Sequence, residues 1–274
     1  MEKLTLKRIL PLAVFILFLI PIITSSLLDL EQKKANELIL EQERIQKAAE
    51  EKAEQKIYLM GKFDPAQRED FILIPEQYTT LGNKMYLRKE ALTAFLEMQN
   101  AADKDEIELK IASATRNFIY QKNIWNNKWS GATIVDGKNL TKDILDELER
   151  FKKILEYSAA PGTSRHHWGT DIDINDANPE YFESEKGKKE YEWFTQNAYK
   201  FGFCQPYNLK GSARPMGYNE EKWHWSYLPL AKNFMQEYKN LIKDEDIKDF
   251  LGDEYVPDLD LINQHVLGIN PDCL

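Results

Sequence analysis

The chain contains 274 residues and carries a formal net charge of −9. This acidic balance argues against nucleic acids and anionic polymers as electrostatic partners. The two cysteines, Cys204 and Cys273, are not spaced as metal ligands. They could form a disulfide in an oxidising compartment, or Cys204 could be a buried thiol in its apolar, aromatic surroundings.

The N-terminus has the pattern of an export signal. Basic residues precede an uncharged apolar run from Ile9 to Ile23, which is typical of a secretory signal or signal-anchor whose basic side stays in the cytoplasm. Together with Thr24–Leu28 the run reaches the length of about 20 residues that crosses a bilayer. We therefore expect an uncleaved membrane segment over residues 1–27, and cleavage near the small residues that end the run is the alternative.

The remaining chain divides by composition into three parts. Residues 28–58 are rich in glutamate, lysine, glutamine and alanine and contain no glycine or proline, which predicts a helix. Its apolar positions are sparse, so we expect a solvated stalk, with a weakly dimerising coiled coil as the alternative. Residues 59–250 are long enough to form one domain with a buried core, and residues 251–274 are expected to be a C-terminal tail.

Within this domain the apolar spacing predicts both helices and strands. Ile107, Leu109 and Ile111 alternate as in a strand. Helical spacing recurs over three stretches: Arg88–Asp103, Asp143–Tyr157 and Gly187–Phe201. Because strands and helices do not alternate strictly, we expect an α+β fold with a small, mainly antiparallel sheet flanked by helices, not a doubly wound fold.

Two short stretches, Ser164–Asp173 and Glu221–Trp225, contain three of the four histidines of the chain. Acid and isoleucine alternate from Asp171 to Ile174, which predicts a strand with the isoleucines in the core and both aspartates on the other face. Aromatic residues alternate around His224, so its side chain should point away from them. If the two strands are neighbours, His224 can meet Asp173.

This combination of residue types is suited to a zinc hydrolase. Two imidazoles and one carboxylate can hold Zn²⁺ and leave a position for water, while an unligated carboxylate such as Glu221 accepts the proton of that water. A lone histidine in an aromatic strand is usually a packed residue, but packing does not explain the whole cluster. Spacing alone leaves open the choice between His166 and His167, and between Asp171 and Asp173.

The pattern Ser-x-His-x-x-Gly-x-x-x-Asp followed by Glu-x-x-His resembles the VanY-type D-alanyl-D-alanine carboxypeptidases and their LAS metallopeptidase relatives. The resemblance runs from about Gly61 to about Leu230. It implies that one Zn²⁺ is bound by His166, Asp173 and His224 and that Glu221 is the catalytic base.

The same resemblance implies further residues at the site. The family places an arginine on a strand-to-helix turn, and Arg116 would bind substrate there and stabilise negative charge near the scissile carbonyl. Ser164 and Gln121 would contact substrate. Two tryptophans that flank the ligands, Trp168 and Trp225, are expected in the wall of the cleft. Asp171 departs from the small residue that is frequent in the family, and it could support the metal site or alter substrate preference.

These features together predict a zinc peptidase that removes the terminal D-alanine from peptidoglycan stem peptides. The catalytic domain would lie on the extracytoplasmic side of the bacterial inner membrane, attached through the N-terminal segment. An endopeptidase that cuts wall cross-links is the alternative among enzymes. A catalytically silent, zinc-containing module that binds wall peptides is the alternative from another class.

Overall fold

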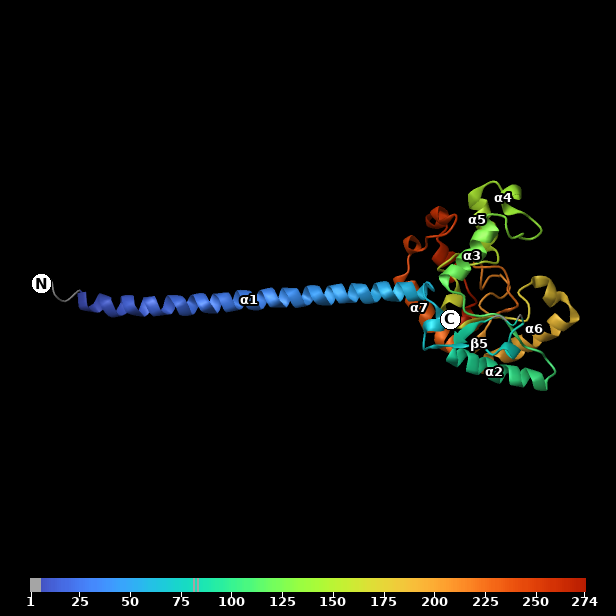
Figure 1. Ribbon diagram of the computed structural model, residues 1–274, viewed down its shortest axis with the longest axis horizontal. Coiled ribbons are helices and arrows are strands. Elements are labelled where there is room, and N and C mark those ends of the chain that lie inside the picture. Colours follow the sequence, from blue (N-terminus) through green and yellow to red (C-terminus); the bar gives the residue numbers. More distant parts are fainter. Residues whose placement is uncertain (1–5, 81, 83) are drawn as a thin grey trace. The chain divides into compact units, whose positions relative to one another are not determined.

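The computed structural model describes the backbone of residues 6–80, 82 and 84–274, and the side chains of these residues from residue 27 onward. Helix α1 spans Leu6–Leu59 (Figure 1), so residues 28–58 are helical throughout. The chain divides into one unit that ends at Glu54 and a compact unit, Gln55–Leu274. Among the described residues, no helix is long and apolar enough to span a bilayer. The predicted membrane run Ile9–Ile23 lies outside the residues whose side chains are described.

The compact unit is built on two small antiparallel sheets, which confirms the predicted α+β class. The four-stranded sheet has the order β3 (Ile111–Ser113), β4 (Asp171–Ile174), β6 (His224–Tyr227) and β5 (Phe203–Cys204), and each neighbouring pair is antiparallel. The second sheet pairs β1 (Phe71–Leu73) with β2 (Tyr86–Arg88). The predicted strand over Asp171–Ile174 is therefore confirmed with these bounds.

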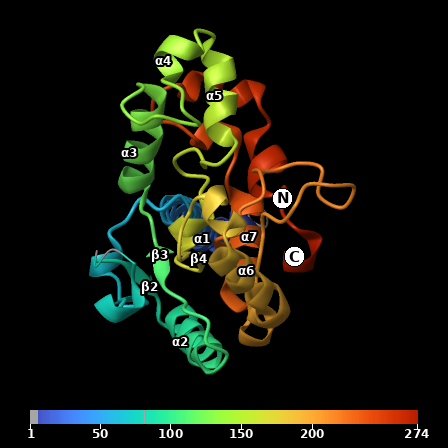
Figure 2. The same ribbon diagram turned by 90° about the vertical axis from the view of Figure 1, so that its right-hand side faces the viewer.

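The helices of the compact unit contribute to two apolar clusters. These helices are α2 (Lys89–Lys104), α3 (Phe118–Trp129), α4 (Leu140–Asp143), α5 (Glu147–Leu155), α6 (Glu185–Asn197) and α7 (Leu228–Leu241). Helices α2 and α6 pack with Ile172, Ile174 and Trp225 in one apolar cluster. Helices α3, α5 and α7 contribute to a second cluster. In Figure 2, α3, α4 and α5 lie at one end of this unit and α2 and α6 at the other, with β3 and β4 between them.

Two predicted elements differ from those observed. The strand predicted from Ile107 begins only at Ile111, because the backbone N–H of Lys110 donates to the Asn175 side chain, 2.7 Å away, instead of a neighbouring strand. The helix predicted over Asp143–Tyr157 is shorter than predicted, since α4 ends at Asp143 and α5 spans Glu147–Leu155. Asp146 begins α5 as its N-cap, with Oδ1 accepting from the Glu149 N–H at 3.0 Å.

The C-terminal residues 251–274 are part of the compact unit and not a separate tail. Leu261, Val266 and Cys273 are buried in the second apolar cluster. Cys273 forms a disulfide with Cys204 of β5, with 5.7 Å between the Cα atoms, which excludes the alternative of a free buried thiol. The Asn270 N–H also donates to the Pro206 carbonyl at 2.7 Å. The end of the chain therefore holds the edge of the sheet.

The disulfide should contribute measurably to stability, because the crosslinked cysteines are 69 residues apart. We expect Cys273→Ser to lower the free energy of unfolding by about 2–4 kcal/mol in urea titrations. A reductant should lower the stability of the natural chain to that of the variant and leave the variant unchanged. Equal unfolding midpoints for both proteins in oxidising buffer would contradict this role.

Candidate metal centre and the cleft around it

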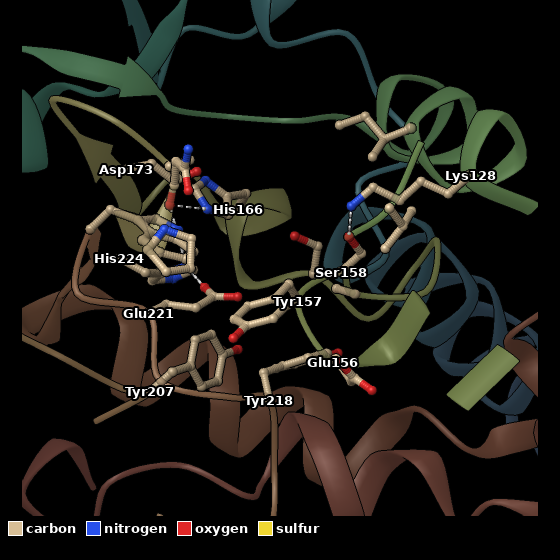
Figure 3. A pocket seen from close by; sticks show the side chains of 18 of the residues that line it. Lys128, Glu156, Tyr157, Ser158, His166, Asp173, Tyr207, Tyr218, Glu221 and His224 are labelled. Atoms are coloured by element: carbon tan, nitrogen blue, oxygen red, sulfur yellow. Dashed lines mark hydrogen bonds and ion pairs between the residues drawn. The ribbon is translucent and has the colours of Figure 1, made fainter. Parts of the chain in front are cut away.

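Three short elements bring the predicted ligands together. His166 lies on a 3-10 helix, η3 (Arg165–Trp168), that leads into β4. Asp173 of β4 is directly opposite His224 of β6 in the antiparallel register, as predicted. One ligand atom from each residue lies within 4.8 Å of the other two. Figure 3 shows the three side chains converging at one side of a pocket, with Glu221 beside them.

The donor atoms of this cluster fit a bound cation. Oδ1 of Asp173 is 3.2 Å from Nε2 of His166 and 3.5 Å from Nδ1 of His224. His166 Nε2 and Asp173 Oδ1 are buried, and neither has a hydrogen-bond partner among the described residues. Buried polar atoms nearly always have hydrogen-bond partners. Two adjacent buried atoms that lack such partners and can coordinate a metal therefore indicate that a cation binds between them. Two imidazole nitrogens and a carboxylate oxygen form a donor set that zinc accepts.

Hydrogen bonds on the outer side of each histidine direct the other ring nitrogen to the centre. His166 Nδ1 lies 2.8 Å from the Ala114 carbonyl, so Nδ1 is the donor and Nε2 keeps its lone pair. His224 Nε2 lies 2.9 Å from Oδ2 of Asp171, which leaves Nδ1 for a metal. A carboxylate behind a metal-binding histidine fixes its orientation and raises its basicity. Asp171 therefore supports the site.

His167 has a structural role, because both of its ring nitrogens are occupied. Nδ1 donates to the Arg116 carbonyl at 2.6 Å, and Nε2 accepts from the Gly162 N–H at 3.0 Å. Burial lowers the pKa of His167 to about 3, so the ring is neutral. The choice that spacing left open between the two adjacent histidines is thus made by their hydrogen bonds, and His166 is the one at the centre.

The centre is strongly charged. Although burial favours the neutral acid, Arg165 and His224 hold the pKa of Asp171 below its usual range. Burial likewise opposes ionisation of Asp173, but His166 and Arg116 lower its pKa. Burial alone would lower the pKa of His224, yet hydrogen bonds to Asp171 and Glu221 raise it to about 9, so a metal that binds at Nδ1 would displace a proton. Ionised carboxylates thus surround the histidines, which favours a cation between them.

Glu221 is placed as a proton acceptor at the edge of the centre. Its Oε2 lies 3.1 Å from Nδ1 of His224. The side chain is buried, and burial raises its pKa although His224 opposes this. Its backbone is fixed on both sides, since its N–H donates to the Tyr207 carbonyl at 2.9 Å and its carbonyl accepts from Gln205 Nε2 at 3.0 Å. A raised pKa and a fixed position suit a general base.

Arg116 lies on the turn between β3 and α3, as the sequence predicted. Its Nη1 is 3.5 Å from Oδ2 of Asp173 and 3.4 Å from the hydroxyl of Ser113. Its buried Nε has no hydrogen-bond partner in the part of the chain that the structure describes. The guanidinium thus adjoins the metal centre with donor capacity to spare, so it can bind an oxygen atom of a substrate.

The centre opens into a cleft of about 720 Å³. Ser164 and Gln121 line it, as predicted, and Gln121 Nε2 donates to the Ala159 carbonyl at 2.7 Å. The buried Oε1 of Gln121 has no partner among the described residues. This amide therefore has an acceptor atom free for a substrate N–H.

The two tryptophans expected in the cleft wall lie in the core instead. Trp168 donates from Nε1 to the Leu59 carbonyl at 3.2 Å, and Trp225 stacks on Phe194 with ring centroids 5.0 Å apart. Trp225 points away from His224 because neighbouring residues of a strand face opposite sides. Trp223 lines the cleft, next to Tyr157. Trp223 precedes β6, so the alternation of side chains along that strand does not predict which way it points.

Other lining residues had no signal in the sequence. They include Lys128, Tyr157, Ser158, Tyr207 and Tyr218. Lys128 lies far along the chain from the motif, whereas Tyr157, Ser158 and Tyr218 lie within a few residues of its two stretches. No spacing rule directs any of these side chains into the cleft. Asp171 carried a signal, since it departs from the family pattern, but its partner could not be read from the sequence.

Comparison with known proteins identifies the family. The profile of the VanY family, described as D-alanyl-D-alanine carboxypeptidase, matches residues 84–230. This chain belongs to the VanY family. The match covers the turn that carries Arg116, the η3–β4 segment and β6, so the candidate centre of this VanY-family chain lies within the shared region.

Individual relatives are similar over part of their length. The putative carboxypeptidase YodJ of Bacillus subtilis is 30% identical over 175 residues, which are 62% of this chain and 56% of that protein. A D-alanyl-D-alanine carboxypeptidase of Enterococcus faecalis is 35% identical over 72 residues, 26% of this chain and 25% of that protein. The VanY-family chain thus spans about half the length of the Bacillus protein.

Solved structures are also similar. VanYB in complex with D-alanine-D-alanine is 23% identical, with a TM-score of 0.45 over 63% of this chain and 91% of that one. The LD-carboxypeptidase LdcB is 28% identical, with a TM-score of 0.46 over 67% of this chain and 81% of that one.

The geometry predicts which substitutions remove the metal. His166→Ala, Asp173→Ala and His224→Ala should each abolish stoichiometric zinc, because each removes one of three protein ligands. Elemental analysis of the purified proteins measures this directly. Full zinc in the His224→Ala protein, or none in the natural chain, would contradict the assignment.

Two variants outside the ligand set serve as controls. His167→Ala should lose stability, because a buried ring and two hydrogen bonds are removed, but should still bind zinc. Asp171→Asn should weaken zinc affinity by roughly 10- to 100-fold without abolishing binding, since it acts through His224. Competition with a chelator measures both affinities.

Proposed function

We propose that this chain is a zinc-dependent carboxypeptidase that removes the terminal D-alanine from peptidoglycan stem peptides. The observation that carries the proposal is the convergence of His166, Asp173 and His224, with unpaired buried donor atoms and Glu221 alongside. Membership of the VanY family supports the substrate class. The cleft beside the centre, at about 720 Å³, has the volume of a ligand-binding pocket.

The residues around the centre have distinct roles in hydrolysis. Zinc held by His166, Asp173 and His224 would supply Lewis acidity toward the scissile carbonyl and favour ionisation of water. Glu221 accepts the proton of the attacking water at a carboxylate oxygen and delivers it to the leaving amine. Arg116 donates to the carbonyl oxygen as negative charge develops there.

Two other functions remain as alternatives, and the peptide assay described below distinguishes them from the carboxypeptidase. An endopeptidase would use the same residues but cut a cross-link between two stem peptides. A zinc-containing binding module would hold wall peptides without cutting them. Glu221 argues against the binding module. A site that only binds peptides does not need a buried carboxylate with a raised pKa beside the metal ligand His224.

The location that we propose is the extracytoplasmic side of the inner membrane, with residues 1–27 as the anchor. The basic residues before the apolar run and the length of that run support this. The disulfide supports exposure to an oxidising compartment.

Substitution of the base separates catalysis from binding. Glu221→Gln should keep zinc and fold but lower turnover by at least about 10²- to 10⁴-fold, since it removes the general base. The assay is release of D-alanine from defined pentapeptides, tetrapeptides and cross-linked dimers. A natural chain that binds these peptides with zinc in place, yet cuts none of them, would establish the binding module instead.

Fractionation of cells tests the location. The full-length chain should sediment with membranes and be digested by a protease added to spheroplasts. A shortened soluble product outside the cytoplasm would replace the anchor by a cleaved signal, and a full-length chain in the cytosol would contradict export.

A further inference from the structure

Lys128 of α3 lines the cleft on the side opposite the metal cluster (Figure 3). Its ammonium group donates to the hydroxyl of Ser158, which also lines the cleft. Within the part of the chain that the structure describes, Lys128 forms no ion pair with a carboxylate. A half-buried ammonium ion thus faces the cleft with one neutral partner.

The acidic residues of the cleft compensate this charge only in part, since Glu221 and Asp136 raise the pKa of Lys128 through their charges but neither forms an ion pair with it. Asp136 and Glu156 line the same cleft, but both are paired with Lys153, at 2.6 and 2.7 Å. Glu221 lies beside His224. The acids near Lys128 therefore have closer cationic partners of their own.

The other cations at the centre are not equivalent to Lys128. Arg165 is paired with Asp171 at 2.9 Å and is fully buried. Arg116 adjoins Asp173. Burial and the nearby charge of Arg116 lower the pKa of Lys128, although the charges of Glu221 and Asp136 oppose this. A desolvated cation with free donor capacity is the feature that binds a carboxylate of a ligand.

We propose that Lys128 and Ser158 form a carboxylate-binding subsite that positions the substrate across the cleft from the metal centre. The inference rests on the proposed function, since it assigns a further contact of the same substrate. Two carboxylates of a stem peptide are candidates, the C-terminal one and the free carboxylate of a dicarboxylic diamino residue. Both present the same chemistry, a planar anion that accepts from an ammonium and a hydroxyl group.

The experiment compares removal of the charge from the protein with its removal from the peptide. Zinc-loaded, full-length Glu221→Gln protein, with and without Lys128→Met, is titrated by calorimetry with four peptides: unmodified, amidated at the C-terminus, amidated at the diamino residue, and amidated at both. Lys128→Met should weaken binding of the unmodified peptide by roughly 10- to 100-fold. One of the two single amides should show no further effect of Lys128→Met, and this amide identifies the bound carboxylate.

Matched variants control for indirect effects. Lys122→Met removes a charge from the same helix outside the cleft and should leave binding unchanged. Lys128→Arg should restore most of the affinity, because it returns the charge. Zinc content and unfolding midpoint should be equal across the series.

The subsite is overturned if Lys128→Met has no effect, or if it weakens all four peptides equally. If the zinc-loaded protein binds none of the peptides, both the subsite and the proposed function fail. If it binds them with the predicted pattern but the natural chain cuts none, the subsite stands and only the proposed function fails.

Discussion

The antiparallel register between β4 and β6 is the constraint on which the site depends. It places Asp173 opposite His224 and Asp171 opposite Ser226. Because side chains alternate along a strand, a slip of one residue would turn both aspartates into the apolar core and the isoleucines into the cleft. The buried positions of Ile172 and Ile174 thus fix the register, and packing of the core determines the geometry of the centre.

This register collects several charges in a buried place, which is costly unless each is paired. Asp171 illustrates the solution, since its two oxygens accept from Arg165 at 2.9 Å, Thr170 at 2.7 Å and Ser226 at 2.9 Å. Asp173 is less well satisfied: one oxygen lies near Arg116, and the other lies beside both ligand histidines but has no hydrogen-bond partner among the described residues. Oδ1 of Asp173 is therefore the atom at which a cation would bind. Metal affinity and folding stability should therefore be linked.

The sequence predicted the centre better than its surroundings, for a physical reason. Period-two alternation at Asp171–Ile174 and around His224 reports directly on which face is buried. It therefore predicted that His224 faces the aspartates if the two strands are neighbours, and the resemblance to the VanY family selected His166 and Asp173 as the ligands. The break between α4 and α5 was not predicted. The side chain of Asp146 caps the first turn of α5, and the spacing of apolar residues does not show where such a cap ends the preceding helix.

Contacts between distant segments could not be predicted in this way. Trp223 lines the cleft although Trp225 was the expected residue, because the strand begins one residue after Trp223. The C-terminal segment has no periodic pattern, but the disulfide and Asn270 attach it to β5 and the following loop. Lys128 carried no signal at all, since its unpaired charge is visible only once the cleft is assembled.

The most direct test of the account is the zinc K-edge X-ray absorption spectrum of the purified full-length protein. The account predicts two imidazole nitrogens at about 2.0–2.1 Å and oxygen ligands at about 2.0–2.2 Å, with no sulfur scattering. The imidazole contribution should fall by half in any zinc that the His224→Ala protein retains. A spectrum with sulfur ligands, or one unchanged by that substitution, would contradict the proposed centre.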